Sequence, residues 1–215
     1  MAELDGPRWG PASKTAPKQL VVLCHGLGVD GHDLIDLAPT WSSALPDALF
    51  VSVDAPFPHA SGFGRQWWSV GDRSPPAVEA GVRSAAGFLN AFIDAELARQ
   101  HLQAQDYALM GFSQGAMTVL FTGLRRTSAP RAILAFSGAL VAPEKLQAEL
   151  ANRAPVLLVH GEADDVVPAQ RSRDAEAALR AAGLPVEAVH VPRLGHGIDD
   201  TGLSLGALTL QRAFA

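Results

Sequence analysis

A serine between two glycines constrains this chain more than any other feature. It lies in the segment Gly111-Phe112-Ser113-Gln114-Gly115, which follows an apolar run from residue 106 and precedes a helical pattern that continues to Arg125. This arrangement predicts a sharp strand-to-helix turn, which holds a serine hydroxyl at the edge of a sheet. Glycines are needed there because the turn strains the serine backbone and brings the strand and the helix close together. We therefore expect Ser113 to be a nucleophile.

Short apolar runs alternate with helical patterns along the whole chain. Polar residues do not interrupt these runs, which is typical of parallel strands in a sheet that helices cover on both faces. The predicted fold class is therefore α/β, with a mostly parallel central sheet and no insertion long enough for a separate lid domain. We expect strands at residues 18–24, 48–54, 106–111, 131–137, 155–160 and 186–191, and helices at residues 34–41, 77–102, 114–125, 143–152, 169–182 and 202–214.

Length and composition indicate a single globular domain. The chain has 215 residues, and we expect a domain at residues 18–215 after a partly ordered leader, residues 1–17, on its surface. A net charge of −5 provides no basic surface for nucleic acid. The leader has no apolar signal-peptide region, and no apolar run approaches the roughly 20 residues of a membrane helix. With a lone cysteine, Cys24, we expect a cytoplasmic protein without integral membrane contact; a homodimer stays open.

A serine hydroxyl needs a neighbouring base, and that base needs a third group to orient it. In proteins with this type of turn, an acid and then a histidine follow the serine along the chain. Asp164 and Asp165 follow the predicted strand 155–160, and the residues alone favour Asp165, which is nearer the next helix. His196 lies between two glycines on the loop before the last helix, so we expect it to be the base.

Two backbone amides are expected to stabilise the oxyanion of the reaction. One belongs to Gln114, whose backbone rather than side chain should matter, and the other to Leu27, in the loop after the first strand, where His25 would be structural. The long loop 55–76 is rich in aromatic side chains and should form a wall of an apolar pocket. No two histidines have the spacing of metal ligands, so we expect no metal site. The expected substrate-binding residues are Leu27, Phe57, Phe63, Trp67 and Trp68.

One segment also permits a different function. Residues 26–31 read Gly-x-Gly-x-x-Gly, and Asp54 follows at a distance that is typical of a dinucleotide-binding fold. Asp30 and Asp33 argue against this function, because they would place negative charge where the pyrophosphate should bind. It would also leave the later serine, acid and histidine unexplained. We therefore expect no nicotinamide cofactor.

Six motifs resemble those of the phospholipase/carboxylesterase family, α/β-hydrolases that include small esterases related to acyl-protein thioesterases. The resemblance implies the α/β-hydrolase fold from Leu20 to Phe214, and it implies that the acid is Asp164, four residues after a histidine that ends a strand. Ser69 stands where the family often has an acidic residue, and Ala116 where many members have glycine, so the resemblance leaves the substrate preference open. In chain order the motifs are His25–Gly31, Arg65–Trp68, Gly111–Gly115, Ser137-Gly138, His160–Pro168 and Gly195-His196.

The expected function is that of a serine carboxylesterase. Such an enzyme would hydrolyse short- to medium-chain acyl esters or thioesters through an acyl-enzyme on Ser113, with Asp164 and His196 completing the triad and no cofactor. A lysophospholipase or an S-acyl-protein thioesterase that acts on longer lipid chains is the alternative within the same chemistry. A binding or scaffold protein that keeps the fold and has lost turnover is an alternative of a different class.

Overall fold

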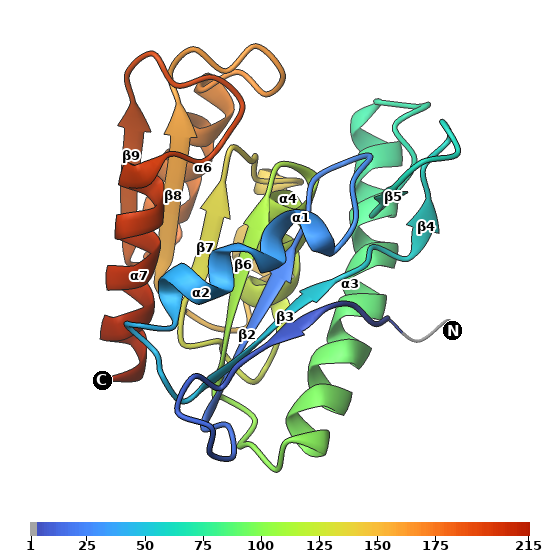
Figure 1. The fold of residues 1–215 in the computed structure, drawn as a ribbon. Helices are drawn as coiled ribbons and strands as arrows, with labels where there is room; N and C mark the ends of the chain where they lie inside the picture. Colours follow the sequence, from blue (N-terminus) through green and yellow to red (C-terminus); the bar gives the residue numbers. More distant parts are fainter. Residues whose placement is uncertain (1–3) are drawn as a thin grey trace.

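The computed structural model describes residues 4–215. In that range a seven-stranded sheet has the order β1-β3-β2-β6-β7-β8-β9. All neighbouring strands are parallel except β1, which is antiparallel to β3, and Figure 1 shows the sheet at the centre of the molecule. Its strands are β1 (Arg8–Trp9), β2 (Gln19–Cys24), β3 (Ala48–Val53), β6 (Tyr107–Phe112), β7 (Ile133–Phe136), β8 (Val156–Gly161) and β9 (Val186–Val191).

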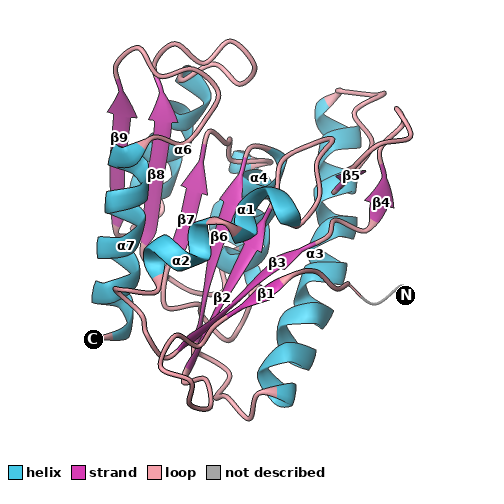
Figure 2. Cartoon of the chain, viewed as in Figure 1, coloured by secondary structure: helices cyan, strands magenta, loops and turns pink. Residues whose placement is uncertain are grey.

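Helices cover both faces of this sheet (Figure 2), as the unbroken apolar strands predict. Helices α3, α4 and α6 pack on one face, and α1, α2 and α7 pack on the other. The chain therefore has the α/β-hydrolase architecture that the sequence predicts. The helices are α1 (His32–Ile35), α2 (Leu37–Trp41), α3 (Pro75–Arg99), α4 (Gln114–Arg125), α5 (Leu146–Glu149), α6 (Gln170–Ala181) and α7 (Asp200–Phe214), with a 3-10 turn, η1 (Pro143–Lys145), before α5.

Strand β2 shows how the two faces are buried. Leu20 and Val22 belong to the core beneath α3, α4 and α6, whereas Val21 and Leu23 belong to the core beneath α1, α2 and α7. Successive side chains of a strand point to opposite faces, so a strand with two buried faces must be apolar throughout. This is the physical reason why the strands could be located from the sequence.

The first residues of the chain add an edge strand to the sheet. Arg8 pairs with Val51 and Trp9 with Phe50, and Arg8 donates to the buried carboxylate of Glu96 on α3 at 3.1 Å. Residues 8 and 9 of the expected leader, residues 1–17, are thus ordered as an edge strand of the sheet. Residues 1–3 of the expected leader lie outside the described residues.

Loop 55–76 contains regular structure that the sequence did not predict. Strands β4 (Phe57–Pro58) and β5 (Arg65–Gln66) form a two-stranded hairpin. A pair of two-residue strands is too short to give the alternation by which strands are identified. The expected helix at 34–41 is likewise divided into α1 and α2, and the one at 143–152 into η1 and α5.

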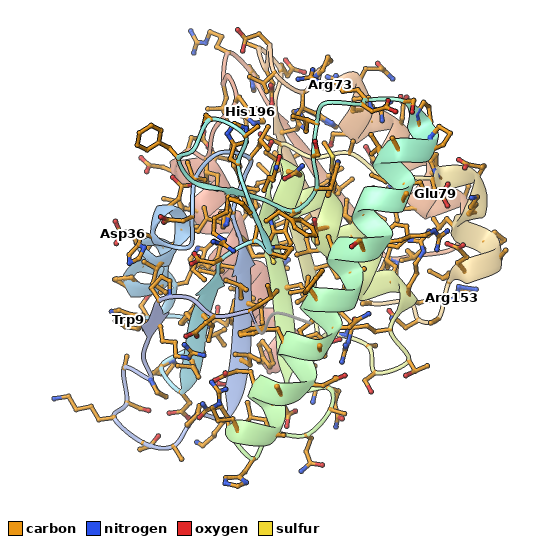
Figure 3. The ribbon with its side chains drawn as sticks, turned by 90° about the vertical axis from the view of Figure 1, so that its right-hand side faces the viewer. Trp9, Asp36, Arg73, Glu79, Arg153 and His196 are labelled. Atoms are coloured by element: carbon orange, nitrogen blue, oxygen red, sulfur yellow. The ribbon has the colours of Figure 1, made fainter. Side chains whose placement is uncertain are left out.

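The candidate catalytic residues lie where the parallel strands end. Ser113 follows β6, Asp164 follows β8 and His196 follows β9, so all three lie at the carboxyl edge of the sheet, where the sites of α/β proteins are built. Figure 3 shows His196 and Arg73 at this end of the molecule. Among residues 4–215, none of the helices has the length and apolar content needed to cross a membrane.

Candidate active site

Ser113 lies at the turn between β6 and α4, with a backbone conformation that side-chain-bearing residues rarely adopt. Its φ is 54° and its ψ is −115°. Close packing on both sides sustains this strain. A Cβ added to Gly115 would lie 1.9 Å from the carbonyl oxygen of Cys24, and one added to Gly111 would lie 2.4 Å from the carbonyl carbon of Gly115. The predicted sharp turn is present, and both glycines are required because α4 approaches the strands so closely.

Asp164 and His196 come together from the loops after β8 and β9. Nδ1 of His196 is 2.7 Å from Oδ2 of Asp164. A carboxylate only accepts hydrogen bonds, so Nδ1 carries the hydrogen and Nε2 can accept a proton. The other oxygen, Oδ1, accepts from the backbone N–H groups of Val166 at 2.9 Å and Val167 at 2.8 Å. Asp165, which the residues alone favoured, is exposed.

These hydrogen bonds keep Asp164 ionised. Burial by itself would raise the pKa of this carboxyl group, because desolvation disfavours the charged form. The hydrogen bonds from His196 and from the two backbone N–H groups outweigh that effect, and the pKa of Asp164 lies below its usual value. The carboxylate can therefore stabilise a positive charge on the imidazole.

Two contacts place the remaining parts of the site beside Ser113. The ring of His196 lies 4.8 Å, centroid to centroid, from that of Phe112, the residue before the serine. A Cβ added to Gly26 would lie 3.5 Å from the Cβ of Ser113. Leu27 follows Gly26 and Gln114 follows Ser113, so each predicted oxyanion residue is next in the chain to a residue at this turn.

His25 anchors the loop that carries Leu27. Its Nε2 accepts from the N–H of Ala55 at 3.0 Å, so its Nδ1 carries the hydrogen and donates to the carbonyl oxygen of Gly26 at 2.6 Å. Burial lowers the pKa of His25, and the ring is completely buried. The structural role that the sequence predicts for His25 is consistent with these contacts. The adjacent Cys24 is also buried, and desolvation raises the pKa of its thiol, which disfavours a reactive thiolate.

The contacts of residues 26–31, the segment with the Gly-x-Gly-x-x-Gly pattern, argue against a dinucleotide site. Asp54, which would contact a ribose in that alternative, accepts from the backbone N–H of Gly31 at 2.8 Å. The helix that follows, α1, has only four residues. Its N-terminus therefore offers little of the aligned dipole that holds a pyrophosphate.

The side chain of Gln114 has a role that the sequence did not predict. It is buried, its Oε1 accepts from the backbone N–H of Trp67 at 2.8 Å, and its Nε2 donates to the carbonyl oxygen of Trp68 at 2.9 Å. Gln114 thus ties the loop 55–76 to the turn that carries Ser113. The expectation that only its backbone matters overlooked these contacts, which depend on residues 46 and 47 positions away.

The predicted substrate-binding aromatic residues differ in their surroundings. Trp67 has no exposed surface, and its Nε1 donates to the carbonyl oxygen of His25 at 2.9 Å. Trp68 is 5% exposed, so both tryptophans are core residues here and the expectation that they line an open pocket is corrected. Phe57 packs edge-on against Phe88, and Phe63, at the hairpin tip, is 82% exposed.

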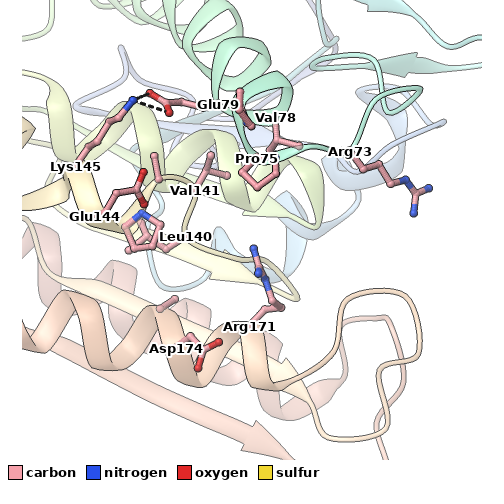
Figure 4. Close-up of a pocket in the computed structure, with 14 residues that line it drawn as sticks. Arg73, Pro75, Val78, Glu79, Leu140, Val141, Glu144, Lys145, Arg171 and Asp174 are labelled. Carbon is pink, nitrogen blue, oxygen red and sulfur yellow. Dashed lines mark hydrogen bonds and ion pairs between the residues drawn. The ribbon is translucent and has the colours of Figure 1, made fainter.

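A pocket of about 610 Å³ lies between α3, the segment 140–145 and α6. In the chain, α3 follows loop 55–76, segment 140–145 follows β7 and α6 follows the Asp164 loop. Figure 4 shows Arg171 reaching into the pocket and Lys145 paired with Glu79, 2.5 Å apart. Val78, Leu140 and Val141 supply apolar surface, whereas none of the five predicted substrate-binding residues lines this pocket.

Comparisons with known proteins agree with this architecture. The model of the family described as Phospholipase/Carboxylesterase matches residues 11–207. The crystal structure of esterase PE8 is similar to this chain with a TM-score of 0.93 and 41% identity, over 99% of this chain and 100% of that one. Esterase YpfH of Escherichia coli is 29% identical over 86% of this chain and 79% of its own length.

Other relatives point to different activities. A protein of Oryza sativa named "Probable inactive carboxylesterase" is 30% identical over 88% of this chain and 82% of its own length. Acyl-protein thioesterase 1 of Neurospora crassa is 27% identical over 82% of this chain and 79% of its own length. The relatives thus include both kinds of hydrolase that the sequence predicts, and one that is named as inactive.

Proposed function

The chain belongs to the phospholipase/carboxylesterase family, and from that premise we propose that it is a serine esterase in which Ser113, His196 and Asp164 act as a catalytic triad. Its substrates are short- to medium-chain acyl esters or thioesters. The observation that carries the proposal is the strained backbone of Ser113, at the turn whose neighbour Phe112 contacts His196. Strain of this kind costs about 1–3 kcal/mol and persists where the surrounding structure requires it.

The reaction takes place in two halves. Ser113 Oγ attacks the substrate carbonyl carbon while His196 Nε2 accepts the hydroxyl proton, and Asp164 stabilises the resulting imidazolium. The backbone N–H groups of Leu27 and Gln114 stabilise the oxyanion of the tetrahedral intermediate. The bond to the alcohol or thiol then breaks, and His196 returns the proton to that leaving group. Water attacks the acyl-enzyme by the same route and releases the acid, and no cofactor takes part.

Substitution of Ser113 tests this proposal. Ser113→Ala should lower kcat on p-nitrophenyl butyrate by at least about 10⁴-fold, because the nucleophile is lost while the fold is kept. The matched control is Ser204→Ala, which removes an exposed hydroxyl on α7 and should keep wild-type turnover. Wild-type turnover by Ser113→Ala would refute the proposal.

The alternative of an inactive binding protein has a direct test. A fluorophosphonate reagent should label wild-type protein at one serine, and Ser113→Ala should not be labelled. If the wild-type protein binds esters but neither turns them over nor reacts with the reagent, the chain resembles its rice relative in lacking activity.

The pocket between α3, segment 140–145 and α6 is the volume that we propose for the acyl chain. Its volume of about 610 Å³ lies within the range of small-molecule sites, and its apolar surface suits an alkyl chain. Val141→Trp should narrow it and lower kcat/KM for octanoyl esters while that for acetyl esters changes little. If both esters respond equally, the acyl chain binds elsewhere.

The leaving group is distinguished by comparing matched substrates. We propose esters as well as thioesters, because some relatives are named esterase and others acyl-protein thioesterase. Octanoyl p-nitrophenol, octanoyl-thiocholine and an octanoyl lysophospholipid have the same acyl chain, so their kcat/KM values rank the leaving groups alone. A cytoplasmic location is part of the proposal, and fractionation of the cells that produce the protein tests it.

A further inference from the structure

His160 lies next to the candidate acid, and no role has yet been given to it. It belongs to β8, and its side chain is completely buried. Its Nδ1 has no hydrogen-bond partner in residues 4–215. An unpartnered buried nitrogen is a cost to stability that an apolar side chain would avoid. The contacts that could offset this cost are those of the other ring nitrogen, Nε2.

Nε2 of His160 faces the Asp164 loop. It lies 2.7 Å from the carbonyl oxygen of Val167 and 3.1 Å from Oδ2 of Asp164. A carbonyl oxygen only accepts, so Nε2 carries the hydrogen and donates to Val167. The positive edge of the ring thus also faces the carboxylate oxygen that contacts His196.

The peptide units of Val167 are held on both sides. Its N–H donates to Oδ1 of Asp164 at 2.8 Å, and its carbonyl oxygen accepts from His160. Val166, which precedes Val167 in the chain, is 64% exposed and therefore gives the loop little apolar packing. Hydrogen bonds rather than apolar packing therefore hold this loop in place, and the one from His160 comes from a buried side chain of the sheet.

We propose that His160 is a positioning residue, which fixes the Asp164 carboxylate through Val167 and so sets the orientation of His196. The inference rests on the proposed function, because it assigns His160 a part in the same triad. A residue that only fills the core would affect folding but not the chemical step. A positioning residue affects kcat, since a displacement of about 1 Å near a reacting group can cost about 10²-fold in rate.

Two substitutions separate positioning from packing. His160→Met replaces the imidazole with an apolar side chain of similar length that has no donor, whereas His160→Gln can still donate to the Val167 carbonyl oxygen. We expect His160→Met to lower kcat on p-nitrophenyl butyrate by about 10- to 100-fold with KM within about twofold, and to slow labelling of Ser113 by a fluorophosphonate in parallel. We expect His160→Gln to stay within about threefold of wild type. Equal kcat values for the two variants would overturn the proposal.

His190→Met is the matched control. His190 lies opposite His160 in the register of β8 and β9, and its Nε2 is also buried without a partner in the described residues. We expect this variant to keep wild-type kcat. If its kcat falls as far as that of His160→Met, loss of a histidine from either strand has the same effect and the positioning role is refuted. If His160→Met does not fold, His160→Asn takes its place, because the shorter amide does not reach the carbonyl oxygen of Val167. Equal kcat values for His160→Asn and His160→Gln would then overturn the proposal.

A double-mutant cycle tests whether His160 acts through Asp164. In an Asp164→Asn background, His160→Met should lower the residual kcat by less than about threefold, because the group that it positions has already been changed. The same loss in both backgrounds would overturn the proposal. The proposed function fails by a different result, which is turnover by Ser113→Ala at the wild-type rate.

Discussion

The side chain of Gln114 provides a sharp prediction about what holds the site together. Its amide bonds to the backbone of Trp67 and Trp68 inside the core, and Trp67 in turn bonds to the carbonyl oxygen of His25. Gln114→Met keeps the volume of the side chain but removes both hydrogen bonds. The perturbation therefore tests the polar contacts alone.

The expected cost follows from the groups that are left without partners. Trp67 has no exposed surface and Trp68 is 5% exposed, so water cannot easily replace the amide. Each unsatisfied buried group costs about 1–3 kcal/mol, which gives a total of about 2–4 kcal/mol after partial relaxation. For a chain of this size such a loss lowers Tm by roughly 5–15 °C. We also expect kcat to fall, because Trp67 ties loop 55–76 to His25, in the loop that carries Leu27, the proposed oxyanion residue.

Thermal unfolding followed by circular dichroism measures the effect, and urea unfolding gives the free energy. Gln66→Met is the matched control, because Gln66 is also buried and makes one side-chain hydrogen bond, at 2.9 Å, to the carbonyl oxygen of Pro58. That proline is exposed, so water can replace the lost donor. If Gln114→Met is no less stable than Gln66→Met, the two buried hydrogen bonds do not stabilise the loop as argued.

Three further predictions concern stability and pH. Gly87→Ala should stabilise α3 by about 0.5–1 kcal/mol in urea unfolding, because beyond its chain neighbours and the nearby backbone of α3 no atom lies within 4 Å of the added Cβ. Gly115→Ala should unfold at much lower urea or not fold, because its Cβ would lie 1.9 Å from the carbonyl oxygen of Cys24. Burial lowers the pKa of His25, so the unfolded chain binds more protons at acid pH. Tm should therefore change little between about pH 6.5 and pH 8 and should fall as the pH drops below about 6.5, and a flat profile to pH 5 would contradict this expectation.

Local chemistry was enough to find the elements and most of the site. The strands could be located because both faces of the sheet are buried, and the order of Ser113, acid and His196 along the chain could be recognised from the turn. The residues alone favoured Asp165, and this choice was wrong because the carboxylate that contacts His196 belongs to Asp164. A signal was present, since an aspartate that accepts from the N–H groups two and three residues later is a common turn, and Asp164 does so.

Long-range contacts account for what the sequence could not predict. Strand β1 has two residues, and only its pairing with Val51 and Phe50 makes it a strand. The tryptophans of loop 55–76 were expected at a pocket wall, because a Pro- and Gly-rich loop is normally exposed. They are buried because Gln114 and the carbonyl oxygen of His25 satisfy their polar groups. Neither partner can be inferred from residues that neighbour the tryptophans in the chain.

The same packing explains why Ser113 can be strained at all. Its φ of 54° is unfavourable, and it occurs where α4 is tightly packed, because Gly115 lies against Cys24 and Gly138 lies against Ala116. The acid is held differently, by the polar contacts of an exposed loop rather than by a packed helix. A substitution in the core near α4 should therefore reduce stability and activity together, whereas one at His160 should reduce activity with a smaller loss of stability. The proposed site thus depends on a tightly packed nucleophile and on an acid whose position is set by hydrogen bonds, and the two can be perturbed separately.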